Sequence, residues 1–193
     1  MSIGWNGRKA GAALAALAAA GVTLAACSTK QESAESPLPA EIHGQALAMT
    51  HEGDEAVKIL EGLHGQAVGS EVNWVGVYGS MEMPTLVYVS RFKTADAAQA
   101  EMDSMVARID AGTAGFGHHT TFRIEDRTVH SVFGQGMVNY FWLQDRDLWW
   151  LGAHPMIARM ALSDLLQVPA DSVPELGMPA MPPAAEPAPG GKP

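Results

Sequence analysis

The chain has 193 residues, of which 21 are acidic and 12 are basic, so its formal net charge is −9 at neutral pH. An acidic chain repels the phosphate backbone of nucleic acids, and no cluster of lysine or arginine offsets that repulsion. We therefore expect no nucleic-acid partner. The length suits a single folded domain.

The first 26 residues have the layout of a secretory signal peptide. Arg8 and Lys9 precede an apolar run from Ala10 to Ala26 that consists almost entirely of Ala, Leu, Gly and Val. A positively charged segment followed by such a run is typical of exported proteins. The run is somewhat short, and too weakly hydrophobic, for a membrane span of about 20 residues. The sequence therefore predicts export of the chain.

The apolar run ends in Leu24-Ala25-Ala26-Cys27, and this segment resembles the lipobox of bacterial lipoproteins. The resemblance implies that the chain is cut before Cys27, that the thiol receives a diacylglyceryl group, and that the new amino terminus is acylated, for example with palmitate. Two or more acyl chains are enough for stable membrane anchoring. Ser28 follows the cysteine in place of Asp, which by the same resemblance favours the outer membrane, facing the periplasm, in a Gram-negative cell.

Cys27 is the only cysteine of the chain, so it has no partner for an intramolecular disulfide. An exported protein with an unpaired thiol calls for an explanation, and lipidation supplies one. Cleavage would leave a formal charge of −11 and a domain with neither cysteine nucleophiles nor cysteine-based zinc sites. Two alternatives stay open: an incidental cysteine beside a conventional cleavage site, and an uncut membrane anchor.

Composition divides the rest of the chain into three parts. Residues 27–41 are polar and contain proline, which indicates a lipidated, flexible linker. Residues 42–169 carry the periodic apolar patterns of a folded α+β domain. Residues 170–193 are rich in Pro and Ala, and we expect them to form a disordered tail.

Within the domain, a helix is predicted first, beginning at the acidic residues Glu52 and Asp54 and ending at Gly65. Its apolar stripe is Ala56, Ile59, Leu60 and Leu63. Residues 71–79 and 85–92 are β-branched and aromatic, and the turn between them indicates a hairpin. Thr94 is then the expected N-cap of a second helix, which ends at Gly112.

Four further strands are predicted at residues 120–125, 128–133, 137–143 and 148–152, with turns short enough for an antiparallel meander. Pro155 begins a last helix that ends before Pro169. The sequence thus predicts a single α+β domain in the order αββαββββα. We expect an antiparallel sheet of about six strands, with about three helices packed on one face.

Aromatic residues are concentrated in the last predicted hairpin, as Tyr140-Phe141-Trp142 and Trp149-Trp150. Neighbouring residues of a strand point to opposite faces, so both faces carry aromatic rings. Burial under the terminal helix is the favoured interpretation for the second face; an exposed binding surface is the alternative. The candidate binding residues are Trp142, Trp149, Trp150 and Tyr140, with Trp74 and Tyr78 as neighbours across the sheet.

Histidine and methionine suggest an alternative, a lipoprotein that handles copper, zinc or haem. His118 and His119 follow a glycine-rich stretch, and Met81 and Met83 lie at a predicted hairpin tip. Imidazole and thioether groups are suitable metal ligands. However, adjacent histidines of a strand point to opposite faces, and no HxH or HxxxH spacing occurs. We therefore expect no metal and no other cofactor.

Neither GxSxG nor HExxH occurs in the chain, so the sequence does not predict an enzyme. An envelope hydrolase without a recognisable motif is a further alternative. The sequence favours a cell-envelope lipoprotein whose domain is a non-catalytic module at a membrane surface. Its partner would be another envelope protein or a small ligand.

Overall fold

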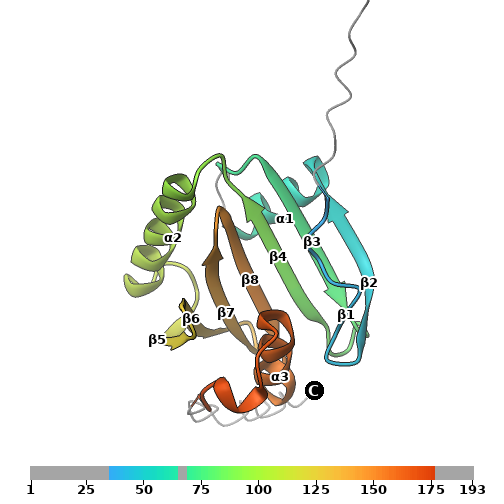
Figure 1. Cartoon of the computed structure of the whole chain (residues 1–193). Coiled ribbons are helices and arrows are strands. Elements are labelled where there is room, and N and C mark those ends of the chain that lie inside the picture. Colours follow the sequence, from blue (N-terminus) through green and yellow to red (C-terminus); the bar gives the residue numbers. More distant parts are fainter. Residues whose placement is uncertain (1–34, 65–68, 177–193) are drawn as a thin grey trace, which may run out of the picture. The chain divides into compact units, whose positions relative to one another are not determined.

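The computed structural model describes residues 35–64 and 69–176. In this part of the chain, one antiparallel sheet has the strand order β1-β2-β3-β4-β8-β7-β6-β5 (Figure 1). The strands are β1 (Glu41–Ile42), β2 (Gln45–Glu52), β3 (Val72–Tyr78), β4 (Thr85–Arg91), β5 (Gly117–Ile124), β6 (Arg127–Gly134), β7 (Met137–Gln144) and β8 (Asp147–Ala153). The helices are α1 (Asp54–His64), α2 (Ala95–Asp110), α3 (Pro155–Leu166) and the short 3₁₀ helix η1 (Ala170–Ser172).

The predicted α+β class and antiparallel sheet are confirmed, but the sheet has eight strands rather than six. The two additional strands, β1 and β2, precede α1. Most side chains of β2 are exposed or half-exposed, so its sequence lacks the apolar and β-branched run that marks an inner strand. Backbone pairing with β3, from Leu47 opposite Tyr78 to Glu52 opposite Trp74, places β2 in the sheet.

The predicted signal peptide, the lipobox with Cys27, and residues 177–193 lie outside the described residues. The described part nevertheless extends beyond the predicted domain on both sides. Leu38 packs on the apolar core, and the Tyr78 hydroxyl donates to the Pro39 carbonyl oxygen over 2.9 Å. Val173 is fully buried, and its carbonyl oxygen accepts from Arg159 Nε at 2.8 Å.

Local sequence explains where the two longer helices begin. The Thr94 hydroxyl accepts a hydrogen bond from the Ala97 amide at 3.1 Å and caps α2. The buried residues of α2 lie three or four positions apart, on one side of the helix: Ala98, Met102, Met105 and Ile109. Pro155 lies in the first turn of α3, where its missing N–H leaves no hydrogen bond unmade.

The helices pack on both faces of the sheet, and the prediction that they share one face was wrong. We call one side of the sheet the α3 face. The strand register places five of its residues next to one another: Trp74, Val89, Trp149, Trp142 and Val129. The adjacent residues point the other way and form the cavity face, with Val75, Tyr88, Trp150, Phe141 and His130 aligned.

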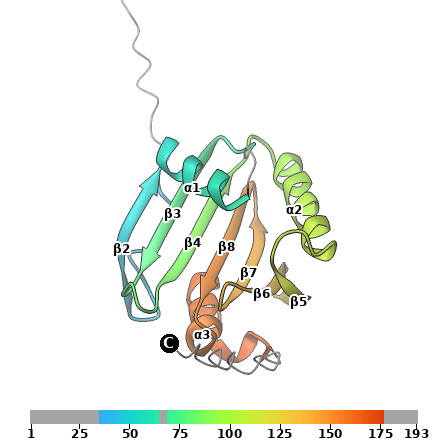
Figure 2. The same cartoon turned by 180° about the vertical axis from the view of Figure 1, so that it is seen from behind.

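α3 covers the α3 face, where Ala158, Ala161 and Leu162 join the core of buried tryptophans. α2 packs on the cavity face against Phe141, and Leu60 of α1 lies on the same side near Tyr88. Figures 1 and 2 show α1 and α3 on opposite sides of the sheet. The physical reason is that inner strands β4, β7 and β8 are apolar on both faces, so each face needs cover.

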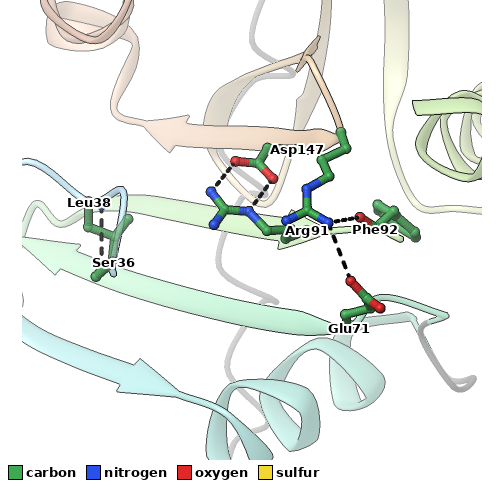
Figure 3. Close-up of polar contacts among 7 residues, drawn as sticks. Ser36, Leu38, Glu71, Arg91, Phe92 and Asp147 are labelled. Carbon is green, nitrogen blue, oxygen red and sulfur yellow. Dashed lines mark hydrogen bonds and ion pairs between the residues drawn. The ribbon is translucent and has the colours of Figure 1, made fainter. Parts of the chain in front are cut away.

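An ion pair joins β4 to β8 at one end of the α3 face (Figure 3). Arg91 donates from Nε and Nη2 to the two carboxylate oxygens of Asp147, over 2.8 and 2.7 Å. The bidentate hydrogen bonds to Asp147 raise the pKa of Arg91. The Arg91 guanidinium also lies 5.0 Å from the Trp74 ring centroid, a cation–π contact that ties the pair to the core.

Candidate binding cavity

A cavity of about 110 Å³ opens on the cavity face between α1 and α2. Its floor is formed by side chains of β4, β8 and β7, and the segment after α2 contributes one wall. The described lining residues are Leu60, Leu86, Tyr88, Ser90, Phe92, Glu101, Met105, Ala114, Phe116, Gln135, Met137, Asn139, Leu148, Trp150 and Gly152. Most of them are apolar, so the cavity presents an aliphatic and aromatic surface with a few polar groups.

Trp150 is the central aromatic residue of the floor. One side of its ring stacks on the buried Phe141 ring, with centroids 4.9 Å apart and planes 7° apart. Phe116 lies against it at 5.2 Å with a tilt of 58°. The indole N–H donates to Asn139 Oδ1 over 3.0 Å. Stacking and this hydrogen bond fix the ring, while half-burial leaves part of it facing the cavity.

Gly152 creates space in the floor. In the sheet it lies between Leu86 of β4 and Asn139 of β7. A Cβ atom at this position would lie 2.9 Å from Asn139 Oδ1 and 3.5 Å from Met137 Sδ. A larger residue would therefore push on the acceptor that holds Trp150.

The polar groups of the lining are few. Burial raises the pKa of Tyr88, and in the described part of the chain its hydroxyl has no hydrogen-bond partner. The Ser90 hydroxyl donates to Asn73 Oδ1 over 2.7 Å. Glu101 contributes the one carboxylate among the described lining residues, and it lies 3.4 Å from Arg108 Nη2.

The aromatic stack continues from the floor to a pair of histidines. His130 stacks on Phe141 at 4.8 Å with planes 11° apart. His130 Nδ1 lies 2.9 Å from His119 Nε2, and His119 Nδ1 lies 2.7 Å from Asp110 Oδ1. Burial, followed by the neighbouring His119, lowers the pKa of His130. A carboxylate and two imidazoles are thus linked in series on the cavity face, beside the floor.

The predicted binding residues separate onto the two faces. Tyr140, Trp142 and Trp149 point to the α3 face and are buried, with exposed fractions of 2, 1 and 8%. Trp142 and Trp149 stack on each other at 5.7 Å, and burial raises the pKa of Tyr140 to about 12. The predicted neighbours, Trp74 and Tyr78, lie in the same core. Of the four predicted residues, Trp150 alone lines the cavity.

The residues considered for metal binding are not brought together. Met81 and Met83 are exposed at the turn between β3 and β4, whereas His118 and His119 lie in β5. The strands β8, β7 and β6 lie between β4 and β5. His118 makes an edge contact with Phe133, and His119 pairs with Asp110. In residues 35–64 and 69–176, no three His, Cys, Asp or Glu side chains form a group that could hold a metal ion.

Several lining residues were not predicted, among them Tyr88, Phe116 and Met137. The sequence of β4 did contain a usable signal, since Leu86, Tyr88 and Ser90 alternate with the fully buried Val87 and Val89. That alternation places Leu86, Tyr88 and Ser90 together on the other face. It does not show that the helices leave this face partly open.

The fold and the cavity define an α+β domain built on one antiparallel sheet with an aromatic-floored cavity on one face. No protein-family description, curated protein or solved structure matches the chain. Across the described residues, no helix has both the length and the apolar character needed to cross a membrane.

Proposed function

We propose that the chain is a lipid-anchored protein of the bacterial cell envelope whose domain binds, without catalysing a reaction, an apolar group of a partner or ligand. The observation that carries the binding part is the cavity on the sheet with Trp150 fixed in its floor. Binding sites are concave, mostly apolar and supplied with a few placed polar groups, and this cavity has each of these properties.

The chemistry of the lining supports binding rather than catalysis. Its one serine, Ser90, donates its hydroxyl hydrogen to the amide oxygen of Asn73, which is not a base. The histidine pair lies beside Phe141, on the side away from Trp150, and is absent from the described lining residues. The aliphatic and aromatic walls instead provide apolar surface that a bound group would remove from water.

The anchor part rests on the sequence Leu24-Ala25-Ala26-Cys27 and on its place at the end of an apolar run. In this proposal, acylated Cys27 and the polar residues that follow hold the domain close to the outer membrane, facing the periplasm. The domain can then meet either a small molecule of the periplasm or an envelope protein.

The binding proposal is tested by crosslinking in cells through a photoreactive side chain. Placed at Gln135, on the cavity lining, it should give a discrete adduct. The same side chain at Met156, which is 76% exposed on α3, is the matched control and should not give that adduct. Adding Trp150→Ala should abolish the adduct at Gln135. A Gln135 adduct that survives Trp150→Ala would show that the cavity is not the binding site.

The anchor proposal is tested separately by Cys27→Ser. The variant should keep the size of the uncut precursor and should lose the acyl chains, measured by electrophoresis and intact-mass spectrometry. Ser28→Ala is the matched control and should be cut and acylated as the wild-type chain is. A Cys27→Ser chain that is still cut at the same bond would contradict the lipobox.

A further inference from the structure

We propose that the cavity is selective for a small molecule with a single planar aromatic ring that carries a cationic or neutral substituent, and that it excludes the carboxylated equivalents. The inference rests on the proposed function, namely that this cavity is a binding site. It adds the chemical class of the ligand, which follows from the size, the walls and the charge of the cavity.

Size limits the ligand to about one ring. The volume is about 110 Å³. An apolar protein cavity of about 150 Å³ is large enough to take up benzene. This cavity is also open on one side, so a substituent on the ring can extend towards solvent while the ring occupies the apolar part. A fused multi-ring ligand or a long acyl chain would not be enclosed.

The walls favour an aromatic ring over an aliphatic group. Trp150, Phe116 and Tyr88 present three aromatic side chains, and ring pairs gain energy from offset or tilted contacts beyond the burial of their area. Met105 and Met137 add two thioether sulfurs, which make favourable contacts with ring edges. Because Trp150 is already held by Phe141 and Asn139, its surface is preorganised for such a contact.

Charge decides which substituent is accepted. Glu101 is the one charged residue among the described lining residues, and its Arg108 partner is not part of that lining. Their side chains are 29% and 30% exposed, so the carboxylate is only partly neutralised by a single 3.4 Å contact. The net charge of −9 makes the electrostatic potential around the chain negative, which further disfavours an anionic ligand. The Tyr88 hydroxyl offers an oxygen that can accept a hydrogen bond from an amine or alcohol.

The test compares three probes of the same size on the full chain: benzylamine, benzyl alcohol and benzoate. Nuclear magnetic resonance of ¹³C-labelled methionine methyl groups reports binding, because Met105 and Met137 line the cavity and Met156 on α3 does not. Their signals are assigned by Met→Leu variants. Benzylamine and benzyl alcohol should shift the two cavity signals with dissociation constants on the order of 1 mM. Benzoate should bind at least about tenfold more weakly than benzylamine, because Glu101 repels its carboxylate but attracts the ammonium group of benzylamine.

The matched pair of variants is Glu101→Gln and Asp103→Asn, each of which removes one negative charge from α2. Glu101→Gln should bring benzylamine down to the affinity of benzyl alcohol and leave benzyl alcohol unchanged, whereas Asp103→Asn should preserve the preference. Equal binding of benzoate and benzylamine to the wild-type chain would overturn the inference, and so would equal effects of the two variants. If no probe moves the Met105 and Met137 signals, the binding proposal itself fails.

Discussion

The two faces of the sheet draw on the same aromatic hairpin but use it in opposite ways. On the α3 face, Trp142 and Trp149 are buried to exposed fractions of 1 and 8%. On the cavity face, Trp150 is half-buried and lines an open space. The difference lies in the cover, since α3 and the segment through Val173 close one face, whereas α1 and α2 leave a gap on the other. The closed α3 face provides stability, and the open cavity face holds the candidate site.

The tryptophans of the two faces also differ in the hydrogen bonding of their indole N–H groups. Trp150 donates to Asn139, but in the described residues the indole nitrogens of Trp142 and Trp149 are buried without a hydrogen-bond partner. An unpaired buried donor destabilises the folded state by about 1–3 kcal/mol. On the closed face, the burial of apolar side chains offsets the destabilisation by these two unpaired donors. The open face instead has a ring whose orientation is determined by a polar contact.

The largest expected effect is the removal of apolar volume from the closed face. Leu162 is fully buried in α3, and Leu162→Ala should lower the free energy of unfolding by about 3 kcal/mol, because a cavity is left behind. The matched change on the open face is Leu86→Ala. Because this side chain is half-exposed, its removal should lower the free energy of unfolding by about 1 kcal/mol. Urea unfolding at pH 7 measures both. Equal losses would show that the two faces do not differ in packing.

The next effect concerns the ion pair at the end of the closed face. Asp147→Ala should destabilise the fold by about 2 kcal/mol, because it leaves Arg91, whose side chain is 23% exposed, without its bidentate acceptor. The exposed pair of Arg146 and Glu71, at 3.5 Å, is the comparison, and Glu71→Ala should change the free energy of unfolding by less than about 0.5 kcal/mol. A double-mutant cycle with Arg91→Met isolates the coupling. A coupling near zero would contradict this role.

A smaller effect should appear as pH dependence on the open face. The pKa of His130 is lowered in the folded chain, and the unfolded histidine titrates near its ordinary value of about 6.5. As the pH falls through about 6.5, the unfolded chain therefore binds a proton before His130 does in the folded chain. The contribution of neutral His130 to the free energy of unfolding is therefore complete above the unfolded pKa. It is lost as the pH falls from there to the folded pKa of His130.

The check is urea unfolding from pH 7 to pH 5.5 for the wild-type chain and for His130→Gln. The wild-type chain should lose more stability over this window than the variant does. The neighbouring groups His119, Asp110 and Asp103 stay in place in both proteins. A variant with the same or a steeper pH dependence would show that His130 is not the group responsible.

The smallest effect is expected for Tyr88→Phe in the cavity. The Tyr88 hydroxyl has no hydrogen-bond partner in the described part of the chain, so its removal should change the free energy of unfolding by less than about 0.5 kcal/mol. The affinity for benzyl alcohol, which that hydroxyl can bond, should fall about threefold, consistent with one modest hydrogen bond. Methionine-methyl resonance measures the affinity. A stability loss above 1 kcal/mol would mean that the hydroxyl has a structural partner.

Elements with a strong local signal were predicted closely. For α2 the capping threonine and the spacing of four apolar residues predict the helix that the structure shows, because both are short-range properties. β2 was missed because its place depends on pairing with β3, far along the chain, and its exposed side chains carry no strand pattern. The strand β5 begins at Gly117, three residues before the predicted start, since a register shift near its beginning extends the pairing with β6.

The candidate site was predicted in part, through Trp150. Adjacent Trp149 and Trp150 must point to opposite faces of a strand, so a division of the rings between the faces follows from local geometry. The remaining lining comes from α1, α2, the segment after α2 and three strands, and no local pattern brings these together.

By itself, the sequence determined the α+β class, the three helices, the antiparallel meander and the acidic charge, because these depend on composition and on neighbours within a few residues. The tertiary structure decided which face α3 covers, how far apart α1 and α2 lie, and hence which tryptophan is core and which lines a cavity. These properties depend on contacts between residues distant in the chain, such as Leu60 and Trp150, which share one cavity although they come from different elements.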